Sequence, residues 1–160
     1  MSSLLGQQAP KFIALTDNGE TISLDNLRGQ TVVLYFYPKD NTSGCIAEAC
    51  DFRDNMQSIR AAGAIVIGIS PDSPASHTTF KNKHQLNFAL ISDQQHDISM
   101  LYGVWVEKSL YGRKYMGIER STFIINPEGI IIREWRKVKV AGHVQAVLQA
   151  LLCLPKLNPE

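Results

Sequence analysis

The sequence predicts an α/β fold in which a mixed central β-sheet is flanked by helices. Continuous runs of β-branched and aromatic residues, TVVLYFY at 31–37 and AIVIGIS at 64–70, are typical of strands buried on both faces. Segments with apolar residues at helical spacing separate these runs, and glycine or proline marks most of their ends. The alternation of the two patterns indicates strands that are connected by helices.

In chain order, the expected elements are a hairpin of residues 12–15 and 21–24, a strand at 31–37, a helix at 44–62, a strand at 64–70, a helix from about 74 to 83, a strand at 88–92, a short helix near 98–102, a hairpin of residues 121–126 and 130–135, and a helix from about 142. This order is that of thioredoxin-like folds with an added N-terminal β-hairpin. We expect a single domain over residues 1–160, with a frayed tail at about 154–160.

Turn-forming and helix-breaking residues set the boundaries of these elements. TDNGE connects the strands of the first hairpin, and Gly63 ends the long helix. Ser73 and Pro74 open the next helix, because proline is tolerated in a first helical turn. Gly129, in the sequence PEG, supplies the turn of the second hairpin.

Composition indicates an ordinary globular protein. The 160 residues are 44% hydrophobic and 19% charged, with a formal net charge of +1. This charge gives no reason to expect nucleic acid or an anionic membrane as a partner, and RKVKV at 136–140 is expected to be a solvated edge. No apolar run has the length of a membrane span, and MSSLLGQQAP lacks the features of a signal peptide. Three cysteines, an odd number, suit a reducing interior, so we expect a cytoplasmic protein.

Two of the three cysteines lie five residues apart in PKDNTSGCIAEAC, residues 38–50. Cys45 falls where a helix is expected to begin after a central strand, at the edge where such sheets carry their sites. The unpaired N–H groups and the dipole of a helix N-terminus favour the thiolate, which is the nucleophilic form. Thr42 offers a hydroxyl to the sulfur or to a substrate oxygen, and Pro38 is placed to shield the site from water. The alternative is that Cys45 is a small buried hydrophobic residue.

Cys50 lies on the same expected helix as Cys45. On an ideal helix, Cα atoms five residues apart are separated by roughly 8.6 Å, which exceeds the limit of about 7 Å for a disulfide. The spacing also fits neither a structural zinc site nor the Cys-x-x-Cys motif of a general disulfide exchanger. The remaining interpretation is a nucleophile and a resolving thiol that meet only after the helix unwinds locally.

These residues resemble the peroxiredoxins. Pro38, Thr42 and Cys45 match the pattern Pro-x-x-x-Thr-x-x-Cys of their active site. YFYPKDNTSGCIAEACDFRD, LISD, YGRKYMGIERSTFIINPEG and WRKVKVAGH are similar to the Q-type, or bacterioferritin comigratory protein, branch, and the resemblance covers about residues 6–152. Ser43 departs from the family, which more often has proline there. We expect Ser43 to act as the helix N-cap and the activity to be retained.

The resemblance implies a thioredoxin-like fold and the reduction of hydrogen peroxide and organic hydroperoxides, without a metal, haem, flavin or other cofactor. Cys45 is similar by position to the peroxidatic cysteine, and Cys50 to the resolving cysteine of members that keep both in one helix. Arg120 is similar to the active-site arginine, and Glu48 to the glutamate that orients it. The implied partners are hydroperoxides and thioredoxin or a similar dithiol reductant, and we expect a monomer.

Two other function classes are compatible with the cysteine pattern. A redox sensor would pass its oxidation to a partner, and steady turnover with a thioredoxin system would distinguish a peroxidase from it. A holdase-type binding module would form a large oligomer.

The remaining reactive residues are expected to be structural. His77, His84, His96 and His143 lack the spacing of metal ligands, so surface or helix-capping roles are expected for them. Cys153 is expected to be an inert thiol packed on the apolar side of the last helix, and the alternative is that it acts as the resolving cysteine.

Overall fold

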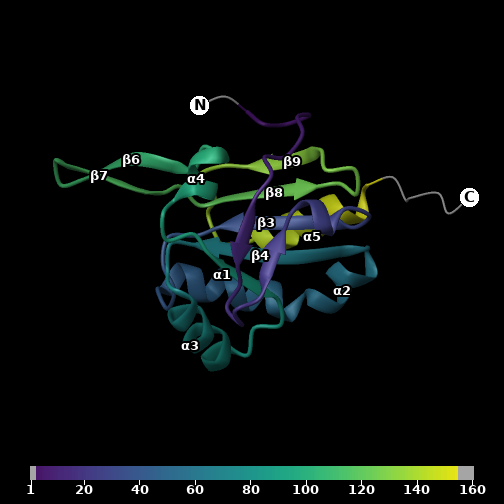
Figure 1. Cartoon of the computed structure of the whole chain (residues 1–160), viewed down its shortest axis with the longest axis horizontal. Helices are drawn as coiled ribbons and strands as arrows, with labels where there is room; N and C mark the ends of the chain where they lie inside the picture. Colours follow the sequence, from purple (N-terminus) through teal and green to yellow (C-terminus); the bar gives the residue numbers. More distant parts are fainter. Residues whose placement is uncertain (1–2, 155–160) are drawn as a thin grey trace, which may run out of the picture.

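The computed structural model describes residues 3–154. Its centre is a five-stranded sheet whose strands lie in the order β5 (Ala89–Ser92), β4 (Ala64–Ser70), β3 (Thr31–Phe36), β8 (Ser121–Ile125) and β9 (Ile131–Trp135) (Figure 1). β3, β4 and β5 are parallel, whereas β8 is antiparallel to both β3 and β9. The predicted mixed central sheet is therefore confirmed.

Alternate residues of β3 enter two hydrophobic cores, one on each face of the sheet. Val33 and Tyr35 pack in the core covered by α1 (Ser43–Asp54), α2 (Met56–Ala61), α3 (Pro74–His84) and α5 (His143–Leu152). Val32 and Leu34 pack in the core covered by β1 (Ile13–Leu15), β2 (Thr21–Ser23), the 3-10 helix η1 (Asp25–Leu27) and α4 (Asp97–Leu101). All six residues of β3 are buried, which is why this strand is continuously apolar in sequence.

The predicted N-terminal hairpin is confirmed, because β1 and β2 form an antiparallel pair. No helix within residues 3–154 is long and apolar enough to cross a membrane. Of the tail expected to fray at 154–160, only Leu154 lies among the described residues.

The segment expected to form one helix over residues 44–62 forms two. α1 ends at Asp54 and α2 begins at Met56, with Asn55 between them at φ −102° and ψ 7°. The side-chain amide of Asn55 donates to the carbonyl of Asp51 at 2.8 Å, a local bond that competes with a continuing helix. Both helices bury apolar residues in the same core, so the apolar spacing continues across the break and does not reveal it.

A hairpin outside the central sheet was not predicted. β6 (Trp105–Leu110) pairs with β7 (Arg113–Ile118), and together they project from the body of the molecule (Figure 1). Much of this hairpin is exposed, so no clear apolar alternation marks it. Its turn residues, Tyr111 and Gly112, have φ values of 52° and 78°. Positive φ at both positions is typical of a two-residue hairpin turn, and the glycine there was the available sequence signal.

The expected packing of Cys153 is wrong. The residue follows α5 and is exposed, whereas Leu151 is only 4% exposed and packs in the core. On a helix, residues two positions apart, such as 151 and 153, are separated by roughly 200° around the axis. The position of Cys153 therefore faces away from the core that Leu151 enters.

Candidate active site

Cys45 lies in the first turn of α1, beyond the carboxyl end of β3. The helix is continuous from Ser43 to Asp54, so it contains both Cys45 and Cys50, and both are free thiols. This confirms the expected helical arrangement of the two residues. Cys45 is 1% exposed and Cys50 is partly buried. Pro38, also partly buried, lies where the chain leaves β3.

The N-cap residue of α1 is Thr42 and not Ser43, so the expected capping role of Ser43 is wrong. The Thr42 carbonyl accepts the first helical bond, from the N–H of Ile46, at 2.8 Å. The Thr42 hydroxyl donates to the carbonyl of Lys39 at 2.8 Å and makes no capping bond to the helix. The N–H groups of the first turn are therefore left without a side-chain cap beside Cys45.

Arg120 brings Cys45 and Glu48 together. Its Nη2 donates to the Cys45 Sγ at 3.3 Å, and its Nη1 donates to Glu48 Oε1 at 2.6 Å. Residues three apart lie on one face of a helix, so a single guanidinium reaches both Cys45 and Glu48. Arg120 immediately precedes β8, and its carbonyl accepts a bond from the N–H of Val138 at 2.9 Å. The structure thus groups three of the residues that the sequence singled out.

The Glu48 side chain is fully buried, and its second carboxylate oxygen, Oε2, has no hydrogen-bond partner within the described residues. Burial raises the pKa of Glu48 to about 7, a shift that Arg120 opposes and Asp51 reinforces. The hydroxyl of Tyr35 is also buried and has no hydrogen-bond partner among residues 3–154. Burial, together with the negative charges of Glu48 and Cys45, raises the pKa of Tyr35 well above its usual value.

Gly44 provides the space in which Arg120 reaches Cys45. A Cβ atom at this position would lie 3.3 Å from Arg120 Nη2 and 4.0 Å from a methyl carbon of Val140. No role of Gly44 was predicted from the sequence. Its place directly before Cys45 was the signal that pointed to it.

Two of the four histidines expected at the surface or at helix caps are buried. His143 begins α5, and its Nε2 lies 2.8 Å from the hydroxyl oxygen of Thr122. Burial and the nearby charge of Arg120 lower the pKa of His143 to about 4. His77 of α3 is fully buried and contacts Asp40 and the carbonyl of Ile91. The partners of both histidines are distant in sequence, so histidine spacing alone does not show these contacts.

Comparisons with known proteins assign the chain to one family. The model of the AhpC/TSA family matches residues 5–134. The chain is 50% identical over 151 residues to the peroxiredoxin Bcp of Bacillus subtilis strain 168, covering 94% of this chain and 96% of that protein. It is 52% identical over 151 residues to a putative peroxiredoxin bcp of Coxiella burnetii, covering 94% of this chain and all of that one. The chain is a Q-type peroxiredoxin of the AhpC/TSA family.

Solved structures of Q-type peroxiredoxins share the fold of this one. A cysteine-to-serine mutant of the Xylella fastidiosa protein superposes with a TM-score of 0.90 at 35% identity, covering 95% of this chain and 98% of that one. The bacterioferritin comigratory protein of Xanthomonas campestris, whose structure addresses alkyl peroxide reduction, superposes with a TM-score of 0.85 at 42% identity. The match covers 88% of this chain and 90% of that one. The predicted thioredoxin-like fold is confirmed. This peroxiredoxin is a thiol-dependent peroxidase, which acts on peroxides and requires a reductant.

Proposed function

We propose that this peroxiredoxin reduces hydrogen peroxide and organic hydroperoxides with Cys45 as the peroxidatic thiol. The observation that carries this assignment is the 3.3 Å contact between Arg120 Nη2 and Cys45 Sγ in the first turn of α1. A fixed positive charge and a helix N-terminus both favour the thiolate. The guanidinium does not lose its own proton near neutral pH, so it remains a permanent cation beside the sulfur.

The first chemical step forms a sulfur–oxygen bond and breaks the peroxide oxygen–oxygen bond. The thiolate gives an electron pair to one oxygen and becomes a sulfenic acid. The other oxygen leaves with the pair of the broken bond, takes up a proton, and departs as water or an alcohol. Negative charge therefore moves from the sulfur to the leaving oxygen. Arg120 and the N–H groups of the first helical turn are placed to stabilise it without reorganising.

Thr42, Pro38 and Glu48 have supporting roles in this proposal. The Thr42 hydroxyl proton is directed to the Lys39 carbonyl, so its oxygen lone pairs remain available to accept a bond from the peroxide O–H. Pro38 has no N–H group and borders the loop as a partly buried ring, where it limits access of water. Glu48 holds Arg120 in the orientation that reaches Cys45, through the 2.6 Å bond to Nη1.

Cys50 is proposed as the resolving thiol. Its sulfur displaces the oxygen of the Cys45 sulfenic acid, which yields an intramolecular disulfide and water. Because both residues lie on one continuous helix, α1 must unwind locally before the bond forms. Thioredoxin or a similar dithiol then reduces the disulfide by thiol exchange. The alkyl peroxide reduction described for the Xanthomonas campestris relative supports organic hydroperoxides as substrates. We also propose that the enzyme is a cytoplasmic monomer; its three free thiols suit a reducing compartment.

Peroxide consumption with thioredoxin and its reductase tests these assignments in three variants. Cys45→Ser is expected to lose turnover, because a hydroxyl stays protonated near neutral pH. Cys50→Ser is expected to consume one equivalent of peroxide, stall as the sulfenic acid, and progress to the sulfinic acid. Cys153→Ser is the matched control, since this exposed thiol lies after α5, and it should retain the wild-type rate. Turnover by Cys45→Ser would refute the assignment of the nucleophile.

Hydrogen exchange on the two redox states tests the resolving step. A mapped disulfide between Cys45 and Cys50 should be accompanied by lost amide protection within residues 44–52. The same disulfide with undiminished protection would contradict the unwinding of α1. Normal cycling of Cys50→Ser would instead assign resolution to another thiol or to the reductant itself.

A further inference from the structure

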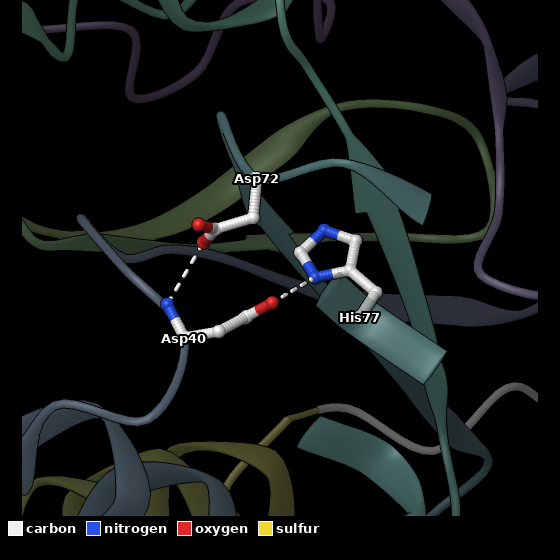
Figure 2. A group of neighbouring side chains, drawn as sticks. All are labelled: Asp40, Asp72 and His77. Atoms are coloured by element: carbon white, nitrogen blue, oxygen red, sulfur yellow. Dashed lines mark hydrogen bonds and ion pairs between the residues drawn. The ribbon is translucent and has the colours of Figure 1, made fainter. Parts of the chain in front are cut away.

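A cluster of buried and partly buried polar side chains joins the loop between β3 and α1 to the start of α3. At its centre is Asp40, which is 6% exposed. Its Oδ1 accepts a bond from the Tyr37 hydroxyl at 2.7 Å, and its Oδ2 accepts one from the Ser76 hydroxyl at 2.8 Å. The same Oδ2 lies 2.8 Å from His77 Nδ1, and the Asp40 N–H donates to Asp72 Oδ2 at 2.8 Å (Figure 2). Residue 40 is therefore held through both its side chain and its backbone.

Both ring nitrogens of His77 make contacts in this cluster. Its Nδ1 faces the Asp40 carboxyl group, and its Nε2 faces the carbonyl of Ile91 at 2.9 Å. The side chains of His77 and Asp40 are 0% and 2% exposed, so water does not reach their contact. Removing either partner would leave buried polar atoms of the other without a hydrogen bond.

Asp40, Asp72 and His77 also place possible metal-ligand atoms within 4.8 Å of one another. The atoms that face each other are already used in hydrogen bonds. Asp72 Oδ2 accepts from the Ser70 hydroxyl at 2.6 Å as well as from the Asp40 N–H. Hydrogen bonding thus accounts for the grouping, which acts to fix the loop.

We propose that the Asp40 anchor, formed by Tyr37, Asp40, Asp72, Ser76 and His77, positions the loop before α1, and with it Thr42 and the Cys45 turn of the helix, and opposes the local unwinding of α1. The inference rests on the proposed roles of Cys45 and Cys50. Two residues separate the anchored Asp40 from the start of α1, and the first of them, Asn41, has a φ of 62°. This conformation is uncommon outside glycine and depends on its surroundings. A shift of residue 40 would therefore move Thr42 and the first turn of α1 together.

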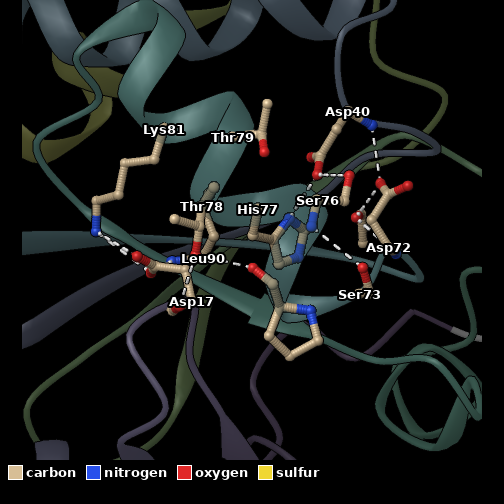
Figure 3. Close-up of polar contacts among 12 residues, drawn as sticks. Asp17, Asp40, Asp72, Ser73, Ser76, His77, Thr78, Thr79, Lys81 and Leu90 are labelled. Atoms are coloured by element: carbon tan, nitrogen blue, oxygen red, sulfur yellow. Dashed lines mark hydrogen bonds and ion pairs between the residues drawn. The ribbon is translucent and has the colours of Figure 1, made fainter.

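The chain contains a matched control for the anchor. Asp17 is another buried carboxylate that pairs with α3, through Lys81 Nζ at 3.1 Å, and it accepts a bond from the N–H of Leu90 at 3.2 Å. Figure 3 shows both carboxylates, Asp17 and Asp40, bonded to side chains of this helix. Asp17 holds the segment after β1 and makes no bond to the loop before α1 among the described residues. Replacing Asp17 therefore shows the effect of a general loss of stability, with the loop before α1 undisturbed.

The experiment compares Asp40→Ala, Asp40→Asn and Asp17→Asn with the wild type. Single-turnover oxidation of Cys45 by hydrogen peroxide is followed by quenched flow and mass spectrometry, and stability by urea unfolding. Misplacing reacting groups by about 1 Å can cost up to a hundredfold in rate, so we expect Asp40→Ala to oxidise roughly tenfold to a hundredfold more slowly. The oxidation rate of Asp40→Asn should fall less, because the side-chain carbonyl of asparagine still accepts a hydrogen bond. Asp17→Asn should lose stability yet stay within about twofold of the wild-type rate.

A second readout separates positioning from general weakening of the fold. At high peroxide, the Cys45 sulfenic acid either forms the disulfide with Cys50 or is oxidised to the sulfinic acid. Loosening the anchor lets α1 unwind more readily, so Asp40→Ala should form the disulfide faster and accumulate less sulfinic acid. Asp17→Asn should form the disulfide and the sulfinic acid in the same ratio as the wild type.

The outcomes are distinguishable. Equal oxidation rates and equal partition in Asp40→Ala and Asp17→Asn would overturn the anchor. If Asp40→Ala does not fold, Ser76→Ala removes one donor to Asp40 and keeps the contact with His77, and it should show the same changes on a smaller scale. In that case, a wild-type oxidation rate and a wild-type partition in Ser76→Ala would overturn the proposed anchor. A wild type whose Cys45 does not react with one equivalent of peroxide would instead refute the proposed function.

Discussion

Two buried carboxylates, Asp40 and Glu48, lie close to the start of α1, and they differ in how completely hydrogen bonds satisfy them. Asp40 uses both oxygens, with contacts to Tyr37, Ser76 and His77. Glu48 uses one oxygen, which accepts from Arg120, and its other oxygen has no partner among the described residues. Buried polar groups are nearly always satisfied in folded proteins, so the incomplete one is the exception that calls for a functional reason.

The basic residues that contact the two carboxyl groups differ in a similar way. His77 contacts the Asp40 carboxylate and a backbone carbonyl, neither of which changes during the reaction. Arg120 contacts Glu48 and the Cys45 sulfur, which is the reacting atom in the proposed mechanism. The comparison separates a fixed pair, which holds the chain in place, from a shared cation, which serves the reacting atom.

The largest effect in this comparison is expected from removing the shared cation. Arg120→Ala should slow the oxidation of Cys45 by about a hundredfold to a thousandfold, the range seen when one fixed donor to a developing charge is lost. Arg120→Lys is the control, because it keeps the charge but cannot direct two N–H groups at two acids. Single-turnover kinetics with hydrogen peroxide would measure both variants. An unchanged second-order rate constant for Arg120→Ala would show that Arg120 does not act on the reacting atoms.

A smaller effect on stability is expected from neutralising Glu48. Its pKa is raised by burial from 4.5 to about 7, so the folded protein holds a proton there that the unfolded chain releases above pH 4.5. The stability that this proton contributes is present at low pH and is lost as the pH rises toward 7. Glu48→Gln should remove this dependence and be more stable than the wild type above pH 7. Urea unfolding between pH 4 and 8 would measure it, and parallel curves for the two proteins would contradict it.

The smallest effect is expected from His143, with the opposite sign. Burial lowers its pKa from 6.5 to about 4, so the unfolded chain binds a proton in this window that the folded protein does not. Its contribution to stability is present above pH 6.5 and is lost as the pH falls toward 4. His143→Gln should flatten the acid side of the same unfolding series. A steeper loss of stability below pH 6.5 in this variant would contradict the assignment.

The sequence predicted the parts of the fold that rest on apolar periodicity. The strands at 31–37 and 64–70 were found because both faces of the central sheet are buried. The β6–β7 hairpin was missed because it lies largely in solvent, and the break at Asn55 because buried residues on both sides belong to one core. Periodicity reports burial, so it does not detect a turn or break that leaves burial unchanged.

The site also contains residues that local spacing predicts and residues that it does not. Cys45, Thr42, Pro38 and Cys50 were singled out from local spacing, whereas the meeting of Arg120 with Glu48 came from resemblance and was located by the structure. Asp40 and His77 are 37 positions apart in sequence, and neither local spacing nor composition pairs them. A pair of this kind depends on how the loop before α1 and the helix α3 meet at the end of the sheet.

The break between α1 and α2 would limit how far the proposed unwinding of α1 extends along the chain. Unwinding is cooperative along an uninterrupted helical ladder, and at Asn55 that ladder stops. Asn55 is also held from outside, since its side-chain oxygen accepts a bond from Gln145 of α5 at 3.4 Å. Met56 and Ile59 of α2 are buried in the core against the sheet. The oxidised enzyme would then present its disulfide in a tethered segment of defined length, with one end at Asp40 and the other at Asn55, on a scaffold that keeps its shape.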